Sequence, residues 1–142
     1  MGEARDLMDQ VTEAFFSGDS SRVAELYASD AIVEAPGQGE MKGGHEVATW
    51  MKEFLDSFPD AKYEALYSHE SGNAAIDEGY FVGTNTGELK MPTGETLPAT
   101  GKSVRIRGCD VATVENGRIT NHRFYFDQME FLGQLGLMPP PS

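Results

Sequence analysis

The sequence predicts an α+β domain in which three helices precede a mostly antiparallel β-sheet. Apolar residues recur at helical spacing as far as Leu55, whereas from Ala61 onward they alternate with polar residues, as in half-buried strands. In addition, Asn116-Gly117 lies between two β-type segments, and this dipeptide strongly favours a two-residue hairpin turn. We expect a sheet of this length to curl around the helices and to leave a conical central pocket.

Each predicted helix has an apolar stripe and a stop signal. The first, over about residues 3–17, ends at Gly18 and carries Leu7, Met8, Val11, Phe15 and Phe16. Asp19 or Ser20 is expected to cap a short second helix, which carries Val23, Leu26 and Tyr27. The third ends before Pro59 and carries Val47, Trp50, Met51, Phe54 and Leu55. A last short helix is predicted over about residues 128–135.

The predicted strands follow the same logic. A short strand over residues 31–35 stops at Pro36-Gly37, and longer strands cover about residues 61–70 and 74–86. The glycine- and proline-containing segment 87–101 is expected to be a long loop. We predict one domain over residues 1–138 and a short proline-rich tail over residues 139–142.

Composition excludes several classes of function. The formal net charge of -12, from 23 acidic and 11 basic residues, disfavours a nucleic-acid or anionic-membrane partner. Cys109 is the only cysteine and can form no internal disulfide, and no signal peptide is visible, so a cytoplasmic location is expected. No segment approaches the roughly 20 apolar residues that a membrane-spanning helix needs.

The hairpin turn suggests a register for the last two strands. With Glu115 opposite Arg118, simple antiparallel pairing places Asp110 opposite Arg123. One face then carries Ile106, Gly108, Asp110, Ala112, Val114, Ile119, Asn121, Arg123, Tyr125 and Asp127. This mixture of polar and apolar groups is typical of a cavity wall.

Short motifs along the whole chain resemble the SnoaL-like polyketide or ester cyclases. They are Phe58-Pro59-Asp60, Gly83-Thr84-Asn85-Thr86-Gly87, Pro92-Thr93-Gly94, Gly101-Lys102, Gly108-Cys109-Asp110, Asn116-Gly117-Arg118-Ile119, Asp127 and Gln134-Leu135-Gly136. The resemblance implies the nuclear transport factor 2-like cone that ketosteroid isomerases and limonene epoxide hydrolases share.

The resemblance also implies a role for one residue. In these cyclases an aspartate at the end of the last long strand acts as general acid/base in an intramolecular aldol ring closure, and it matches Asp127. This chain departs from the family at two positions. Asn85 stands where the family commonly has a histidine, and Arg123 stands where it commonly has a tryptophan.

We therefore expect Asp127, Arg123 and Asp110 to be catalytic, with Arg123 stabilising an enolate oxygen. Two structural alternatives stay open. Asp127 would also serve as the N-cap of the final helix, and Asp110 with Arg123 would also form a purely structural ion pair. The expected substrate-binding residues are Asn121, Tyr125, Trp50, Phe54 and Phe15. No metal-ligand spacing or nucleotide-binding loop is present, so neither a metal nor a cofactor is expected.

These residues favour a cofactor-independent cyclase or isomerase that acts on a small carbonyl-containing molecule. One alternative is a non-catalytic module that binds a small ligand, and another is epoxide hydrolysis with water activated by Asp110, Arg123 and Asp127. The opposite face of the hairpin needs a cover. A homodimer through the sheet face with Val111, Phe124 and Phe126 is the expected assembly.

Overall fold

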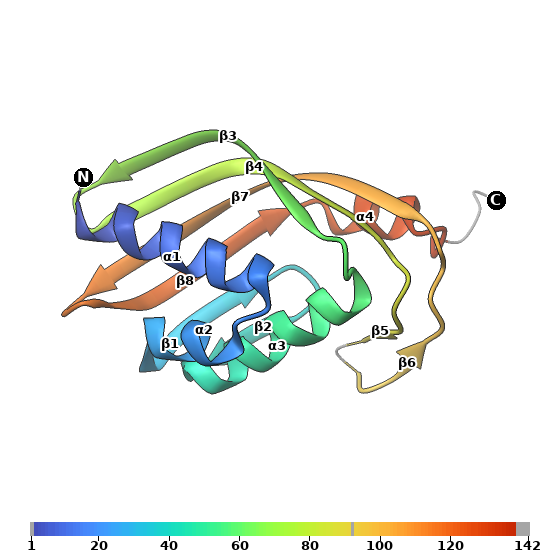
Figure 1. Cartoon of the computed structure of the whole chain (residues 1–142), viewed down its shortest axis with the longest axis horizontal. Helices are drawn as coiled ribbons and strands as arrows, with labels where there is room; N and C mark the ends of the chain where they lie inside the picture. Colours follow the sequence, from blue (N-terminus) through green and yellow to red (C-terminus); the bar gives the residue numbers. More distant parts are fainter. Residues whose placement is uncertain (1, 92, 139–142) are drawn as a thin grey trace.

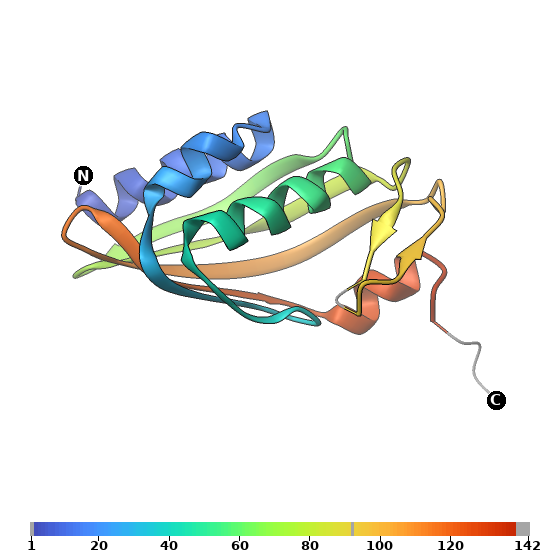
Figure 2. The ribbon, with the colours of Figure 1, turned by 90° about the horizontal axis from the view of Figure 1, so that it is seen from below.

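A curved six-stranded sheet forms the body of the molecule, and three helices cover its concave face (Figures 1 and 2). The helices are α1 (Glu3–Ser17), α2 (Ser20–Leu26) and α3 (Gly43–Ser57), and a fourth, α4 (Gln128–Gln134), lies at one end of the sheet. This confirms the predicted α+β class and the order of its elements. The computed structural model describes residues 2–91 and 93–138, so the predicted tail over residues 139–142 lies outside them.

The sheet has the strand order β2-β1-β8-β7-β4-β3, in which only β1 and β8 run parallel. The strands are β1 (Tyr27–Ala35), β2 (Gly39–Lys42), β3 (Lys62–Ser71), β4 (Ala74–Thr84), β7 (Ser103–Glu115) and β8 (Arg118–Phe126). Two predictions need correction here. Tyr27 begins β1 rather than ending the second helix, and the segment between Pro36-Gly37 and the third helix contains β2, which the sequence did not predict.

The segment predicted as one long loop contains a small hairpin, β5 (Leu89–Lys90) and β6 (Thr96–Leu97). The fully buried Asn85 amide anchors the base of this segment. Its Nδ2 donates to the carbonyls of Ser57 at 3.0 Å and Gly87 at 2.9 Å, and its Oδ1 accepts from the Thr100 backbone N–H at 2.7 Å. At position 85, asparagine therefore has a structural role.

Local signals set the helix ends as predicted. Gly18 ends α1 in the left-handed conformation with φ 76°, which glycine adopts without strain. The Asp19 carboxylate caps α2 by accepting from the Arg22 N–H at 3.1 Å. At the start of α1 the cap comes from a distant strand, because the Glu70 carboxylate accepts from the backbone N–H groups of Gly2 and Arg5.

The β7–β8 hairpin turns at Asn116-Gly117 as predicted, with φ 52° and 76°. Glu115 lies opposite Arg118, but the register then shifts by one residue, because Thr113 pairs with Asn121. Thr120 is thus the extra residue of a β-bulge. Beyond the bulge, Asp110 lies opposite Phe124 and not opposite Arg123, so the predicted Asp110–Arg123 pair is wrong.

A one-residue shift turns every later side chain of β8 to the other face of the sheet. His122, Phe124 and Phe126 therefore face the helices, and Asn121, Arg123 and Tyr125 face outward. The physical reason is apolar burial. Ile119 and Phe124 have opposite parity along the strand, so both can face the core only if one additional residue separates them.

The core consists of two apolar clusters beneath the helices. One joins α1, α2 and α3 to β1 and the turn end of the hairpin, and includes Met8, Val11, Tyr27, Val33, Val47 and Ile119. The other lies beside α4 and includes Phe58, Leu89, Val104, Ile106, Phe131 and Leu135. Aromatic side chains between the two clusters are only partly buried, which indicates space among them.

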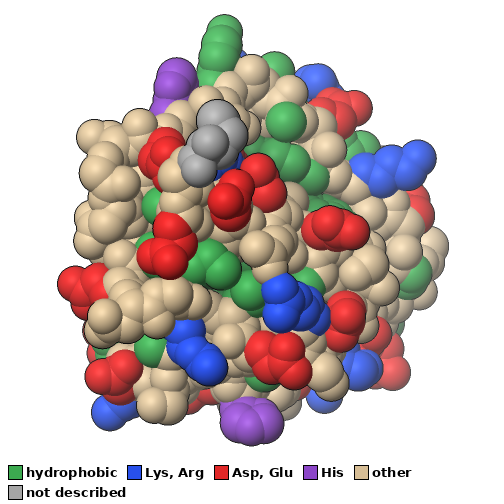
Figure 3. Space-filling view, turned by 60° about the vertical axis from the view of Figure 1, so that its left-hand side comes forward, with side chains coloured by type: hydrophobic (Ala, Val, Ile, Leu, Met, Phe, Trp, Pro, Cys, Tyr) green, Lys and Arg blue, Asp and Glu red, His purple; other side chains and the backbone are tan. Residues whose placement is uncertain are grey.

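Charged side chains are distributed over the outside of the molecule. On the face shown in Figure 3, acidic side chains are spread out rather than gathered in one patch. The net charge of -12 therefore gives a diffuse negative surface without an evident docking patch on this face.

Candidate active site

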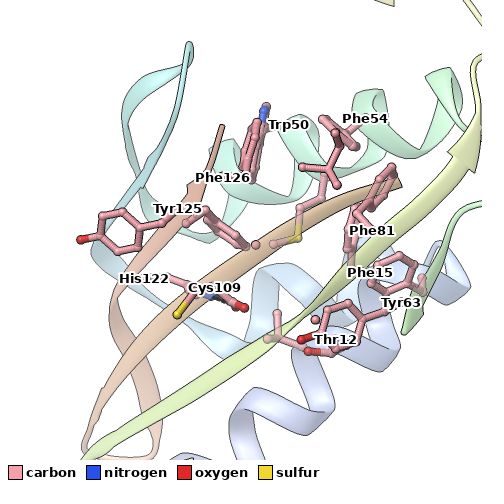
Figure 4. Close-up of a pocket in the computed structure, with 18 of the residues that line it drawn as sticks. Thr12, Phe15, Trp50, Phe54, Tyr63, Phe81, Cys109, His122, Tyr125 and Phe126 are labelled. Carbon is pink, nitrogen blue, oxygen red and sulfur yellow. Dashed lines mark hydrogen bonds and ion pairs between the residues drawn. The ribbon is translucent and has the colours of Figure 1, made fainter. Parts of the chain in front are cut away.

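An apolar cavity of about 140 Å³ lies between the concave sheet face and helices α1 and α3 (Figure 4). Its walls are mostly aromatic and aliphatic, and include Val11, Phe15, Phe16, Trp50, Met51, Phe54, Phe81, Ile106, Phe124, Phe126 and Phe131. Among these apolar walls, the cavity-lining residues with polar side-chain groups include Thr12, Tyr63, Asp110 and His122. An apolar enclosure with a few polar groups is typical of a small-molecule site.

Two paired glycines form a bare part of the cavity wall. Gly79 on β4 lies opposite Gly108 on β7, and both line the cavity. A Cβ on Gly79 would come within 2.6 Å of the Tyr63 hydroxyl oxygen and within 2.5 Å of the Glu64 carbonyl oxygen. Only glycine at position 79 lets the Tyr63 ring lie against the sheet.

The central polar feature is a chain of three side chains from three strands. The Asp110 Oδ2 lies 2.7 Å from Nε2 of His122, and the His122 Nδ1 lies 2.6 Å from the Tyr27 hydroxyl. Tyr27 and His122 are each 1% exposed, and the Asp110 side chain is 18% exposed. Asp110 is thus the most accessible member of the chain at the cavity wall.

The chemistry of these groups assigns the protons. Burial, and secondly the charge of Asp110, raise the pKa of the Tyr27 hydroxyl far above its ordinary value, so it stays protonated. It can then donate to Nδ1 of His122, and the Nε2–H of His122 can donate to the Asp110 carboxylate. Both imidazole nitrogens are occupied, so His122 orients the carboxylate.

A second carboxylate lies beside the first. Asp77 on β4 is directly opposite Asp110 on β7 and is 4% exposed. Its Oδ1 lies 2.7 Å from Nη2 of Arg5, a buried arginine on α1. Burial and the charge of Asp110 raise the pKa of Asp77, and Arg5 offsets part of this effect.

The Tyr63 hydroxyl also lies at the cavity, and its environment is unusual. The oxygen is buried, and within residues 2–91 and 93–138 it has no hydrogen-bond partner. Burying a hydroxyl without a hydrogen-bond partner costs about 1–3 kcal/mol of folding free energy, because the group gives up its hydrogen bonds to water. Burial, Asp77 and Asp110 raise the pKa of Tyr63, so its proton is retained.

The predicted site residues separate into two groups. Asp110, Phe15, Trp50 and Phe54 line the cavity. Tyr125 touches its rim, but the ring is turned away (Figure 4) and the residue is 55% exposed. The structure places Asn121 and Arg123 outside the cavity lining, where the Arg123 guanidinium donates to the Asn121 side-chain oxygen. The bulge at Thr120 explains this correction.

Asp127 is the N-cap of α4. Its carboxylate accepts from the Glu130 backbone N–H at 3.0 Å, and the residue is exposed. Among the described residues it is not part of the cavity wall. Its expected position on the cavity face is therefore wrong, because the bulge reverses the end of β8, while its catalytic role stays a prediction.

Sequence reasoning missed His122 and Tyr63, because the regular register predicted for β8 turns the His122 side chain away from the cavity. The signal for the bulge was present: Ile119, Phe124 and Phe126 are all strongly apolar, yet they cannot share a face in a regular strand. The pairing of Arg5 with Asp77 had no local signal, because 72 positions of sequence separate the two residues.

A second, larger cavity of about 460 Å³ adjoins the first. It is lined by parts of α3, α4, the β1–β2 turn and the β5–β6 hairpin. The two cavities share the side chains of Trp50, Phe54, Phe126 and Phe131. These four rings form the partition between an inner apolar chamber and an outer, more polar one.

Residues 8–122, which run from α1 to the central histidine of the polar chain, match the SnoaL-like domain family. The chain belongs to this family. Its sheet and helices have the nuclear transport factor 2-like arrangement predicted from the sequence motifs. Membership supports a catalytic or ligand-binding role for the protein.

Solved structures show the same fold. IdmH from Streptomyces antibioticus, a candidate polyketide cyclase, is 26% identical with a TM-score of 0.74, over 92% of this chain and 96% of that one. A candidate SnoaL-like polyketide cyclase from Jannaschia sp. CCS1 is 12% identical with a TM-score of 0.82, over 97% and 94%. An LEH-like epoxide hydrolase of M. tuberculosis is 22% identical with a TM-score of 0.70, over 94% and 90%.

No curated protein sequence matches the chain. In the described part of the chain, no helix has the length and apolar character needed to cross a membrane. Residues 2–91 and 93–138 also contain no cluster of three or more histidine, cysteine or acidic side chains arranged to hold a metal ion.

Proposed function

We propose that this SnoaL-like domain is a cofactor-independent acid–base enzyme that removes a proton from a carbon next to a carbonyl group, as cyclases and isomerases do. Asp110 is the base. The observation that carries this assignment is the Asp110–His122–Tyr27 chain, which ends in a carboxylate at the wall of an apolar cavity.

The hydrogen bonds favour Asp110 over His122 as the base. Both nitrogens of His122 are engaged, so it has no lone pair free for a substrate proton. Among the described residues, Asp110 is hydrogen-bonded through Oδ2, which leaves Oδ1 for a ligand. A positioned carboxylate in an apolar site typically accelerates proton transfer by about 10²–10⁴-fold.

The size of the inner chamber limits the substrate. An apolar protein cavity of about 150 Å³ holds benzene, and the inner chamber measures about 140 Å³. The reacting part of the substrate is therefore the size of a single ring. A longer substrate would extend past the aromatic partition into the outer chamber.

The base can be tested with 1,2-benzisoxazole, a compact probe of carboxylate bases. Loss of its C3 proton breaks the N–O bond and releases 2-cyanophenolate, which is followed by its near-ultraviolet absorbance. We expect Asp110→Asn to lower this rate by about 10²–10⁴-fold, because the amide keeps the shape but cannot accept the proton.

Asp127→Asn is the matched control. Asparagine also caps helices, so this variant should keep the fold and, if Asp110 is the base, the full rate. Equal rates for wild type and Asp110→Asn would exclude this base. Benzisoxazole that binds without turning over would favour the non-catalytic binding module. If only Asp127→Asn lowered the rate, Asp127 would be the base, as the family resemblance implies.

Epoxide hydrolysis is less well supported as a function. The proposed set of Asp110, Arg123 and Asp127 would need to converge on one water molecule. The bulge separates these residues, since Arg123 faces outward and Asp127 caps α4.

We also propose that the protein is a homodimer that uses the outer face of the sheet. Phe124 and Phe126, expected to form this interface, lie against the cavity instead. The proposal is supported by exposed aromatic rings on the outer sheet face, Tyr67 at 56% and Tyr125 at 55% exposure. Exposed aromatic side chains are enriched where proteins associate.

A further inference from the structure

The hydroxyl of Tyr63 is a polar group in the cavity wall, and it is not part of the Asp110–His122–Tyr27 chain. It is buried, and it has no hydrogen-bond partner among residues 2–91 and 93–138. The ring stacks on Phe16 with a centroid separation of 6.0 Å and rests against Gly79. Packing therefore holds the hydroxyl in place although nothing in the described chain bonds to it.

The position of this hydroxyl relative to the base follows from the sheet register. Its oxygen lies beside Gly79, which pairs with Gly108. Asp110 is two residues further along β7, so Gly79 and Asp110 are diagonal neighbours on one sheet face. Such neighbours are about 7–8 Å apart when measured between their positions on the strands. Tyr63 and Asp110 therefore line neighbouring parts of the same cavity.

We propose that Tyr63 is a substrate-binding residue that donates a hydrogen bond to the carbonyl oxygen of a neutral, ring-sized ketone whose adjacent carbon lies at Asp110. This assignment rests on the proposed function and adds the donor that stabilises the negative charge developing on the carbonyl oxygen. When the base takes the proton, the electron pair of the C–H bond moves onto the carbonyl oxygen, and the Tyr63 O–H is directed at that oxygen.

The surroundings of Tyr63 keep it a donor. Burial, followed by the charges of Asp77 and Asp110, holds the pKa of the phenol above its ordinary value. The hydroxyl thus carries its proton at neutral pH. The same negative surroundings disfavour an anionic ligand, which is why the proposed substrate is neutral.

The test uses a ligand pair that differs only at the atom in question. Cyclohexanone carries a carbonyl oxygen, and methylenecyclohexane has a CH₂ group in its place. Trp50 is the only tryptophan and lines the cavity, so its fluorescence reports binding of both ligands. Tyr63→Phe removes only the hydroxyl, and Tyr67→Phe, at an exposed tyrosine on the same strand, is the control.

We expect Tyr63→Phe to weaken cyclohexanone binding about tenfold, the effect of one hydrogen bond of about 1.4 kcal/mol, and to leave methylenecyclohexane binding unchanged. Tyr67→Phe should change neither. Because the removed hydroxyl is buried and unpaired, Tyr63→Phe should fold with a melting temperature equal to or above that of wild type. Equal weakening of both ligands, or of neither, would overturn the assignment and indicate a packing role.

The benzisoxazole reaction separates this inference from the proposed function. Tyr63→Phe should also slow that reaction, because the departing phenolate oxygen loses its donor. If Asp110→Asn abolishes turnover while Tyr63→Phe leaves ketone binding intact, Tyr63 alone is misassigned. If Tyr63→Phe weakens only ketone binding while Asp110→Asn converts benzisoxazole at the wild-type rate, Tyr63 is a binding residue and Asp110 is not the base.

Discussion

Asp77 is a buried carboxylate whose surroundings oppose its ionisation. It faces Asp110 across the β4–β7 pair, and its counter-charge is Arg5. Arg5 is also held by Asp9 and by the backbone carbonyl of His69. The pKa of Asp77 is raised because burial and the Asp110 charge outweigh the ion pair. The buried pair therefore positions α1 on the sheet more than it stabilises the fold.

This raised pKa predicts a distinct pH dependence. As pH rises above 3.8, the ordinary value, the unfolded chain loses its Asp77 proton before the folded protein does. Ionisation of Asp77 then lowers the free energy of unfolding. We expect Asp77→Asn, which does not titrate, to become more stable relative to wild type between about pH 4 and pH 7. Denaturant unfolding at several pH values in this range gives the free energy of unfolding of both proteins. The test is how the difference between the two values changes with pH, because a difference in stability that is the same at every pH does not affect this change.

Asp60→Asn provides the opposite case. The Thr84 backbone N–H donates to the Asp60 carboxylate at 2.7 Å and lowers its pKa. The stability that this bond contributes is present above the ordinary pKa and is lost as pH falls. Asp60→Asn should therefore become less stable relative to wild type as pH rises. If Asp77→Asn also became less stable relative to wild type as pH rises, the Arg5 ion pair would outweigh burial in its effect on the pKa of Asp77.

The β-bulge at Thr120 is the element that decides which side chains enter the cavity. With Thr120 present, His122, Phe124 and Phe126 face inward. Without it, a regular hairpin would direct Asn121, Arg123 and Tyr125 at the helices. The bulge therefore places the partner of the proposed base.

Deleting Thr120 should disrupt the core rather than produce a rearranged site. The chain would have to expose Phe124 and Phe126 or give up its pairing with β7. Truncation of one core aromatic costs about 3–5 kcal/mol, so we expect a loss of at least this size. Thermal unfolding followed by circular dichroism and by Trp50 fluorescence would measure it.

Thr120→Ala is the control for this deletion, because it keeps the residue count. It removes one hydrogen bond, from Thr120 Oγ1 to the Thr113 carbonyl at 3.3 Å, so its cost should stay near 1 kcal/mol. A deletion variant as stable as Thr120→Ala would show that the bulge does not determine the facing of β8.

At the scale of the whole molecule, the sheet has two differently used faces. The concave face meets the helices and encloses the two chambers (Figure 2). On the outer face, Arg105 stacks on the Tyr80 ring at 3.7 Å and pairs with Glu64, and Arg107 pairs with Glu78. The exposed Tyr67 and Tyr125 lie on the same sheet.

The dimer proposal predicts an oligomeric mass of twice the 15.5 kDa chain. Placing a charge within an apolar contact disfavours association, so Tyr125→Asp should raise the dimer dissociation constant at least about tenfold. Light scattering across a dilution series measures this. Met129→Asp, on α4 and 65% exposed, is the control and should remain dimeric. A wild-type monomer at micromolar concentration would contradict the proposal.

Local sequence patterns were sufficient for the order of the elements and for part of the cavity wall. Helical spacing identified α1 and α3, and with them Phe15, Trp50 and Phe54, because the period of a helix determines which side chains share a face. Asn116-Gly117 identified the hairpin turn because few residues accept positive φ. Asp110, which precedes the bulge along β7, was therefore placed on the correct face.

The polar centre depended on tertiary structure. Whether β8 follows a regular or a bulged register is decided by burial of Ile119 and Phe124 against helices far away in sequence. That choice brought His122 to Asp110 and moved Arg123 and Asp127 away from the cavity. The Arg5–Asp77 pair and the unbonded Tyr63 hydroxyl likewise arise where separate elements pack together. Side-chain direction along a regular strand is local information, whereas a bulge, and the partner across a cavity, are determined only when the chain is folded.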